Sequence, residues 1–245
     1  MRIDICTLFP ECFDYLNHSI LGEARKKNIL KIHIHNIRDF SSSKHKQVDD
    51  YPFGGGAGML LTLEPVLKTI EHIETISDLK NPYKVLFTPK GNLLNQKKIE
   101  KLKEKKWLIL ICPRYEGIDE RILNFIDEEI SVGDFILSGG ELPALILIEA
   151  LAREIPNVLG NKESLKEETF QNFLLEPPQF TRPENYNGLK VPKILLSGNK
   201  KKIEKWRKAM SIKLTFLKRK DLIYKADLDE EGKKILKALE EKYGK

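Results

Sequence analysis

Cysteine, long apolar runs and internal repeats are all scarce in this sequence. The three cysteines, Cys6, Cys12 and Cys112, are odd in number and lack metal-ligand spacing. This excludes a disulfide framework and, with no signal peptide at the start of the chain, favours the reducing cytoplasm. No apolar run approaches the roughly 20 residues of a membrane span. We therefore expect a cytoplasmic globular protein that does not enter a membrane.

The charge is unevenly distributed along the 245 residues. Hydrophobic residues make up 41% of the chain, enough for one large domain or two modest ones, and the formal net charge is +6. Residues 193–220 hold eleven Lys or Arg and one acid, Glu204, so this segment carries +10 and the remainder about −4. A basic segment on a mildly acidic body suggests an anionic partner, with nucleic acid first. The alternative is a solvated helix face.

The first part of the chain alternates between short apolar runs and helical spacing. The runs typical of strands are residues 3–8, 31–37, 84–87, 108–112 and 135–137. The segments with helical periodicity are residues 10–27, 63–76, 95–105, 118–125 and 141–151. This alternation predicts an α/β fold, a parallel sheet with helices on both faces.

The last part of the chain predicts a smaller, helical unit. Residues 160–171 are polar, lack periodicity and read as a linker, and residues 179–183 follow a Pro-Pro pair, which favours extended backbone. Asn199 is expected to cap a helix, and residues 229–243 show core spacing in a last one. This unit has few apolar residues, so we expect it to pack against a partner surface.

Ionisable residues and glycines follow the ends of the predicted strands. Arg114, Tyr115 and Glu116 follow the run at 108–112, the pair Gly139-Gly140 follows the run at 135–137, and residues 88–91 end a third strand. Open α/β sheets bind ligands at such strand ends. The glycine pair suits a close backbone approach or a positive φ, although a plain tight turn remains the alternative. The sequence thus predicts one pocket.

Two other patterns are weaker. His33 and His35 alternate on a strand, but no third ligand is near in sequence, so polar surface is favoured over a metal site. The glycine-rich stretch at 48–59 does not have the spacing of a dinucleotide or P-loop motif. It is either a flexible connector or a backbone that another surface approaches closely.

The pocket motifs together carry a family resemblance. Residues 114–121 read Arg-Tyr-Glu-Gly-Ile-Asp-Glu-Arg, residues 133–134 read Gly-Asp, and residues 137–143 read Leu-Ser-Gly-Gly-Glu-Leu-Pro. With these motifs the chain resembles the bacterial tRNA (guanine-N1)-methyltransferases of the SPOUT superfamily over almost its whole length. The resemblance implies methyl transfer from S-adenosylmethionine to N1 of guanosine 37 of tRNA, 3′ to the anticodon, and leaves a role for Mg²⁺ open.

The resemblance also implies an architecture. It places a SPOUT methyltransferase domain at residues 1–159 and an interdomain linker at residues 160–175. A mainly helical tRNA-binding domain would follow at residues 176–245. The parallel sheet would contain a deep trefoil knot within residues 86–142, a threading that general topology rules disfavour. The family works as a homodimer, with the donor at one subunit's knot and tRNA spanning both.

Site residues carry over from the family position by position. The implied donor-binding residues are Leu86, Phe87, Thr88, Pro89, Pro113, Tyr115, Gly117, Val132, Gly133, Asp134, Phe135, Ile136, Leu137, Gly139, Gly140 and Pro143. The implied tRNA-binding residues are Lys200, Lys201, Lys202, Trp206, Arg207, Lys208 and Arg219. No resident metal ligand is implied.

Three residues are the implied catalytic groups. Glu168 occupies the place of the family's aspartate, the general base that removes the N1 proton; without the resemblance it would read as a solvated linker acid. Arg153 matches the family's catalytic arginine, although a cation in a last helical turn also suits the helix dipole. Glu116 matches an acid beside donor and guanine, with a surface ion pair as the alternative.

Two positions depart from the family pattern. Glu168 is one methylene longer than aspartate, and because a misplacement of ~1 Å can cost ~10²-fold in rate, the surrounding pocket must differ or the reaction is slower. Pro113 stands where the family usually has glycine, and proline lacks an N–H. Two other functions remain open: a SPOUT methyltransferase with a different RNA target, and an RNA-binding protein without activity.

Overall fold

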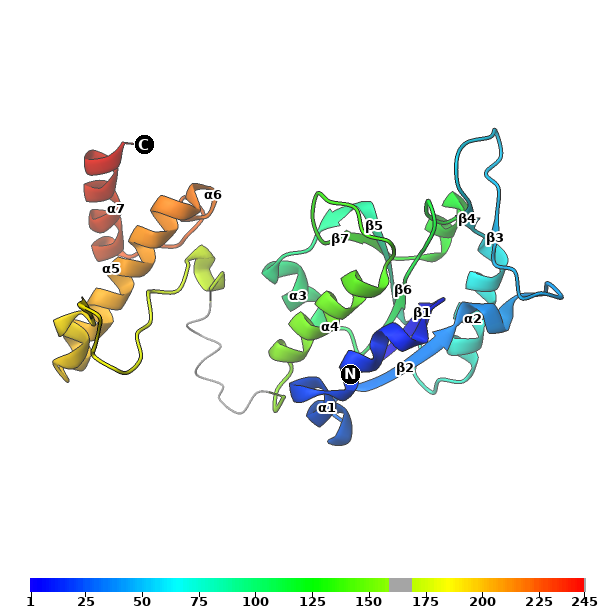
Figure 1. Ribbon diagram of the computed structural model, residues 1–245, viewed down its shortest axis with the longest axis horizontal. Coiled ribbons are helices and arrows are strands. Elements are labelled where there is room, and N and C mark those ends of the chain that lie inside the picture. The colour runs from blue at the N-terminus through cyan, green and yellow to red at the C-terminus, as the bar shows by residue number, and fades with distance from the viewer. Residues whose placement is uncertain (159–168, 245) are drawn as a thin grey trace. The chain divides into compact units, whose positions relative to one another are not determined.

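The computed structural model describes residues 1–158 and 169–244, and the chain divides into two compact units, Met1–Gly160 and Asn161–Lys245 (Figure 1). The first unit contains, in chain order, β1 (Arg2–Thr7), η1 (Pro10–Asn17), α1 (Ser19–Lys26), β2 (Lys31–Asn36), η2 (Ile37–Phe40), β3 (Asp49–Asp50), β4 (Leu60–Leu61), α2 (Leu63–Thr75), β5 (Tyr83–Leu93), α3 (Gln96–Lys103), β6 (Trp107–Ile111), η3 (Glu120–Phe125), β7 (Glu128–Ser131) and α4 (Glu141–Glu154), where η denotes a 3₁₀ helix. Within the described ranges, none of the helices combines the length and apolar character that crossing a bilayer requires.

Five strands of the first unit form one parallel sheet in the order β2-β1-β6-β5-β7. Ile5 of β1 pairs with Ile34 of β2 on one side and with Leu110 of β6 on the other. β5 pairs with β6 and with the edge strand β7, where the register shifts between Phe87 and Asn92. Because all five strands run the same way, their carboxyl ends share one edge of the sheet.

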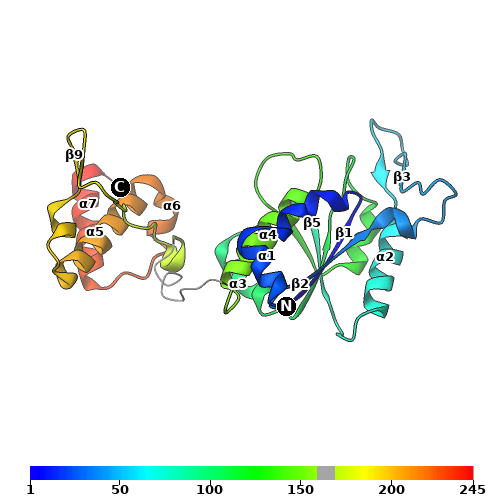
Figure 2. The same cartoon turned by 60° about the horizontal axis from the view of Figure 1, so that its bottom comes forward.

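Helices cover both faces of this sheet (Figure 2), as predicted. Strand β6 shows why: Leu108 and Leu110 pack into one core with α1, α3 and α4, whereas Ile109 and Ile111 pack into a second core with α2. All four side chains are fully buried. Alternate side chains of a strand point to opposite faces, so an unbroken apolar run is what a strand between two helical layers requires. The α/β prediction is confirmed.

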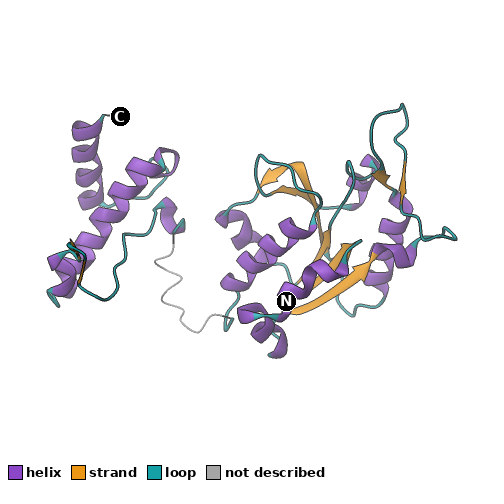
Figure 3. Cartoon of the chain, in the orientation of Figure 1, coloured by secondary structure: helices purple, strands orange, loops and turns teal. Residues whose placement is uncertain are grey.

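The second unit is mainly helical (Figure 3). It contains η5 (Gln171–Phe173), the two short strands β8 (Asn185–Tyr186) and β9 (Leu189–Lys190), η6 (Lys193–Leu196), α5 (Lys200–Lys218), α6 (Lys220–Ile223) and α7 (Glu230–Tyr243). Ile212 and Phe216 of α5 pack with residues of α7 in a small core. The predicted cap at Asn199 is present, because its side chain accepts a hydrogen bond from the N–H of Lys202. Asp229 caps α7 in the same way by accepting a hydrogen bond from the N–H of Gly232.

One predicted strand is wrong. Residues 135–137 form an irregular loop in which Ile136 is 81% exposed, so this apolar run is not a buried strand. The fifth strand is β7, which comes earlier and reads Glu-Glu-Ile-Ser. Its acidic residues concealed it, because an edge strand can carry polar side chains that find polar partners. Glu128 forms an ion pair with Lys98 and accepts a hydrogen bond from the Tyr83 hydroxyl. The predicted helix at 10–27 is also two elements, η1 and α1, separated at His18.

Asp4 is a buried carboxylate that three donors satisfy. Its side chain is 0% exposed and accepts hydrogen bonds from Arg2 Nε (2.7 Å) and Trp107 Nε1 (2.7 Å), and His35 Nε2 lies 2.8 Å from Oδ1. Burial by itself raises the pKa of Asp4, but the hydrogen bonds from His35, Arg2 and Trp107 outweigh it and lower the pKa from 3.8 to about 2. The carboxylate therefore stabilises the fold in its ionised form.

This network predicts a specific loss of stability in acid. Because the folded-state pKa lies below the unfolded one, the contribution of Asp4 is complete above pH 3.8 and is lost as the pH falls toward 2. The loss should be roughly 2 kcal/mol. Urea unfolding of the wild type and of Asp4→Asn between pH 6 and pH 2 measures it. The gap between the two curves should narrow below pH 4; a constant gap would contradict the assignment.

Candidate active site

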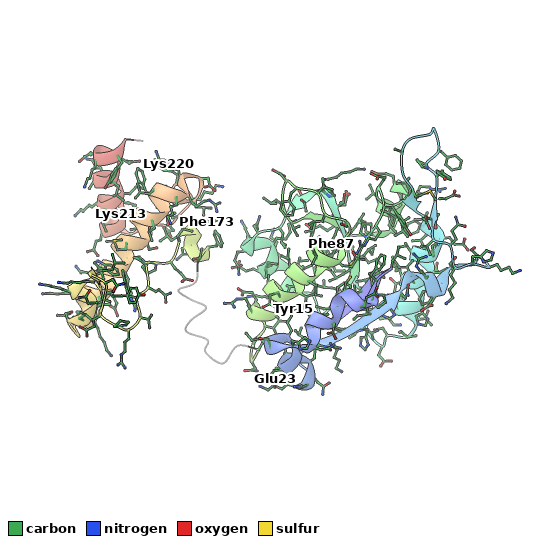
Figure 4. All side chains as sticks on the ribbon, viewed as in Figure 1. Tyr15, Glu23, Phe87, Phe173, Lys213 and Lys220 are labelled. Carbon is green, nitrogen blue, oxygen red and sulfur yellow. The ribbon has the colours of Figure 1, made fainter. Side chains whose placement is uncertain are left out.

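A cavity of about 580 Å³ lies at the carboxyl edge of the sheet, where β6 and β7 end. Its walls are residues 86–90 of β5, the segment 113–118 after β6, and residues from 129 to 140 that lead from β7 to α4. Phe87 lies in the interior of the first unit at this edge (Figure 4) and is 2% exposed. The position is the one that the strand-end motifs predicted, although the third wall begins at β7 and β5 continues to Leu93.

The structure brings nearly all the predicted donor-binding residues to this cavity. Those that line it are Leu86, Phe87, Thr88, Pro89, Pro113, Tyr115, Gly117, Val132, Gly133, Phe135, Ile136, Leu137, Gly139, Gly140 and Pro143. Glu116 lines it as well, whereas Asp134 does not. Lys90, Arg114 and Ser138 also line it; they belong to the strand ends that predicted the pocket, although they are not among the implied donor-binding residues. Sequence reasoning missed Leu60, Ile118, Glu120, Ile122, Leu123, Glu129, Ile130 and Ser131.

The cavity suits a small organic ligand in size and character. Its volume falls in the range of about 300–1,000 Å³ that is usual for ligand pockets. Apolar side chains such as Leu86, Ile122 and Leu137 provide much of the wall, and glycines provide open backbone. An adenine ring and a methionine chain need this mixture of apolar surface and accessible backbone polar groups. The residues present therefore fit S-adenosylmethionine.

Gly140 explains the close approach of two walls. A Cβ atom at this position would lie 2.6 Å from Cys112 Cα and 2.9 Å from Pro113 Cδ, distances that real Cβ atoms essentially never show. Its φ of −81° is ordinary, so proximity and not conformation requires glycine here. A side chain at position 140 would displace the end of β6, so Gly140→Val would report on folding and is no test of ligand binding.

Pro113, which stands where the family usually has glycine, still forms a backbone hydrogen bond through its carbonyl group. Its carbonyl oxygen accepts a hydrogen bond from the N–H of Gly140 at 2.9 Å, and Arg114 forms a bridge with Gly139. The carbonyl of Pro113 thus joins the segment after β6 to the start of α4. The missing N–H does not prevent that connection.

The side chain of Glu116 lies against a glycine of the loop at 51–58. A Cβ atom at Gly58 would lie 2.4 Å from Cγ of Glu116, so the glutamate side chain crosses directly over the Gly58 backbone, whose φ is +86°. The N–H of Glu116 donates to the carbonyl of Met59 at 3.0 Å. The glycine-rich stretch is therefore a backbone that another group approaches closely, at Gly58 at least.

A buried network links Arg114, which lines the cavity, to the start of α4. Glu141 is 2% exposed; its Oε1 accepts the Thr7 hydroxyl at 2.8 Å and its Oε2 lies 2.9 Å from Arg114 Nε. This last contact is an ion pair without good hydrogen-bond alignment. The Arg114 guanidinium also lies 4.4 Å from the ring centre of Phe9 and donates to the carbonyl of Ser138 at 3.4 Å. Arg114 thus connects two cavity walls, the segment after β6 and the segment before α4.

Of the other two candidate catalytic residues, the structure describes only Arg153. Arg153 is in the last turn of α4 and does not line the cavity. Glu168 lies outside the described residues, as does Glu167. The position of the candidate general base therefore remains a prediction from the family pattern.

The candidate tRNA-binding residues lie on or beside α5 in the second unit. Lys200, Lys201 and Lys202 form its exposed first turn, Lys208 pairs with Asp229, and Arg219 pairs with Asp221 at 2.7 Å. Three cations at a helix N-terminus oppose the helix dipole. Such a turn is stabilised when an anion binds there, which is what a phosphate backbone supplies.

The two histidines of β2 have different surroundings. His35 contacts Asp4, and burial lowers the pKa of His33. In the part of the chain that the structure describes, no three His, Cys, Asp or Glu side chains gather as metal ligands. His35 therefore belongs to a structural hydrogen-bond network.

Comparisons with known proteins agree with this geometry. The profile of a family described as "tRNA (Guanine-1)-methyltransferase TrmD" matches residues 1–225. A protein of Clostridioides difficile (strain 630) named tRNA (guanine-N(1)-)-methyltransferase is 52% identical over 93% of this chain and 99% of its own length. A protein of the same name from Dictyoglomus turgidum is 46% identical over 98% of this chain and 96% of its own length. The chain therefore belongs to the tRNA (guanine-1)-methyltransferase family.

Proposed function

We propose that this protein transfers a methyl group from S-adenosylmethionine to N1 of guanosine 37 of tRNA. The observation that carries the proposal is the cavity at the carboxyl edge of the sheet, which the family motifs line from three sides. Family membership supports tRNA as the substrate and guanine N1 as the atom that is methylated. The position within tRNA is the finer inference and comes from the resemblance of the motifs.

The proposed chemistry divides among three residues. When bound, the donor supplies a methyl group on a positively charged sulfur. Guanine N1 carries a proton at neutral pH, and the carboxylate of Glu168 would accept it as general base. The guanidinium of Arg153 would stabilise the negative charge that grows on O6. Glu116, fixed over Gly58 at the cavity wall, would orient the guanine.

A homodimer is part of the proposal. Phe135, Ile136, Leu142 and Ile146 are large apolar side chains that remain 47–81% exposed on the first unit. Leu142 and Ile146 are one turn apart on α4, so they face the same way. A second copy of the chain would cover them. Light scattering of the purified protein should give twice the chain mass of 28.3 kDa.

Two architectural inferences and one about a metal ion accompany this function. The boundaries 1–159, 160–175 and 176–245 assign donor binding to the first domain and tRNA binding to the last. The trefoil knot within residues 86–142 rests on family membership, and a crystal structure traced through that range would test it. A role for Mg²⁺ is tested by adding EDTA to the methylation assay.

Nucleoside mapping tests the proposed reaction directly. Unmodified tRNA is incubated with protein and donor, and mass spectrometry then locates the methylated nucleoside. Methyl on N1 of guanosine 37 supports the proposal, and methyl elsewhere would assign a different RNA target. Donor-binding calorimetry without RNA separates an enzyme from a simple RNA-binding protein, because only the enzyme needs the cavity.

Neutralising the first turns of α5 should weaken tRNA binding and its salt dependence. Changing Lys200, Lys201, Lys202 and Lys205 to Gln should flatten the slope of log affinity against log salt by about one unit for each phosphate that the protein no longer neutralises. Filter binding at several salt concentrations measures the slope. Neutralising Lys26, Lys27 and Lys31 of the first unit is the control, and an equal change there would show that the assignment is wrong.

A further inference from the structure

The loop at 169–176 has a strained backbone. Phe170, Asn172 and Phe173 have φ values of 76°, 51° and 60°, in the left-handed region. Asn adopts this region readily, but a bulky residue does so only when its surroundings enforce it. Two of these three residues are phenylalanines, whose bulk makes a positive φ an outlier. Backbone strain of this kind concentrates at functional sites.

Hydrogen bonds fix the 169–176 loop. The N–H of Thr169 donates to Glu176 Oε1 at 3.1 Å, and the N–H of Glu176 donates to Thr169 Oγ1 at 3.2 Å. Between these two residues, the N–H of Phe170 donates to the carbonyl of Leu174 at 2.9 Å, and the N–H of Phe173 donates to the carbonyl of Phe170 at 3.2 Å. The loop is therefore a defined turn.

The same loop is attached to α5. The N–H of Leu175 donates to the buried Thr215 hydroxyl at 2.8 Å, and the hydroxyl of Ser211 donates to the carbonyl of Leu175. Leu174 packs against the core of the second unit. The apolar side chain that stabilises this loop is thus a leucine, and the two phenylalanines are available for another purpose.

Both phenylalanine rings are exposed, and that of Phe170 lies beside a cation. Phe170 is 45% and Phe173 39% exposed. The Arg219 guanidinium lies 5.9 Å from the ring centre of Phe170, and exposed Lys218 and Lys220 flank Arg219 in the chain. Figure 4 labels Phe173 and Lys220 on the second unit. Burial does not explain why two large apolar rings stand exposed on a strained backbone, one of them beside Arg219.

We propose that Phe170 and Phe173 form an aromatic platform on which an unpaired base of the tRNA anticodon loop stacks. Exposed rings beside Arg and Lys are the arrangement that binds single-stranded nucleic acid, because bases stack on the rings while cations contact the phosphates. A base inside a duplex cannot reach such a platform, so the ligand must come from a loop. The inference rests on the proposed function and specifies how the second unit selects its substrate.

The variant Phe173→Asn distinguishes a loss of base stacking from a loss of folding. Asparagine suits the left-handed backbone, so the full-length variant should unfold at the same temperature as the wild type or higher. Its affinity for tRNA should fall about 5- to 150-fold, the usual effect of losing one stacked base. Phe173→Tyr keeps the aromatic face and should bind like the wild type. Unchanged tRNA affinity of Phe173→Asn would overturn the platform.

Abasic tRNAs identify the stacked base and keep the test independent of folding. Each unpaired anticodon-loop nucleotide is made abasic in turn, and one of these changes should weaken binding to the wild type but not to Phe173→Asn. If no abasic change affects the wild type, or if every change affects both proteins equally, the platform is wrong. Wild-type methylation of guanosine 37 is followed in the same preparations, so failure of the proposed function is seen separately.

Discussion

Glu168→Gln should lose about 10²- to 10⁴-fold in methyl transfer while donor and tRNA binding persist, because general-base catalysis typically contributes that much. Glutamine keeps the shape of glutamate but cannot accept a proton at neutral pH. Single-turnover methylation of saturating tRNA measures the chemical step, and calorimetry confirms binding. Because Glu168 lies outside the described residues, this measurement is the direct test of its role as general base.

Two neighbouring variants sharpen that experiment. Glu167→Gln is the matched control, one residue away and of the same chemistry, and its effect should be mild. If Glu167→Gln is the inactive variant instead, the family's aspartate position has been transferred to the wrong residue. Glu168→Asp then distinguishes two accounts of the longer side chain: a faster enzyme means that the extra methylene costs rate, and a slower one means that the pocket has adjusted to glutamate.

Glu141→Ala should destabilise the first unit by about 3 kcal/mol and weaken donor binding. Removing one partner of a buried ion pair leaves the other charge uncompensated, which typically costs about 3–5 kcal/mol, and Arg114 is 23% exposed on its side chain. Arg114 would also lose the anchor that holds it across two cavity walls. Urea unfolding measures the first effect and donor calorimetry the second.

The matched control for Glu141 is Glu149 on the same helix. Its carboxylate accepts an exposed hydrogen bond from Tyr15 at 3.2 Å, so Glu149→Ala should change stability by no more than about 0.5 kcal/mol. The double variant Glu141→Leu with Arg114→Met should recover most of the lost stability, because apolar residues can replace a buried pair. If the double variant is as unstable as Glu141→Ala, the ion pair is not the source of the loss.

The fold could be predicted wherever a strand is buried on both faces. The run at 108–112 indicated β6 because both its faces pack on helices, and the cap at Asn199 indicated the start of α5. Strand β7 could not be found this way, since an edge strand needs few apolar residues and reads Glu-Glu-Ile-Ser. Ile136 misled for the opposite reason, because an apolar residue on an exposed loop has the pattern of a buried one.

The contacts that shape the site were beyond sequence reasoning. Thr7 and Glu141 are 134 positions apart and meet only because β1 ends and α4 begins at the same edge of the sheet. Periodicity carries no information about such pairs. The family motifs did predict which residues line the cavity, but the need for glycine at position 140 became visible only with the 2.6 Å approach to Cys112.

The contact between Gly58 and Glu116 joins the loop at 51–58 physically to the cavity wall. The loop exposes Tyr51 and Phe53, the latter completely, while its last glycine lies under a cavity-lining side chain. A macromolecule that orders this loop thereby alters the freedom of Glu116. Coupling between two binding events is reciprocal, so any factor by which an ordered loop changes donor affinity is also the factor by which a bound donor changes the affinity of the loop for that macromolecule.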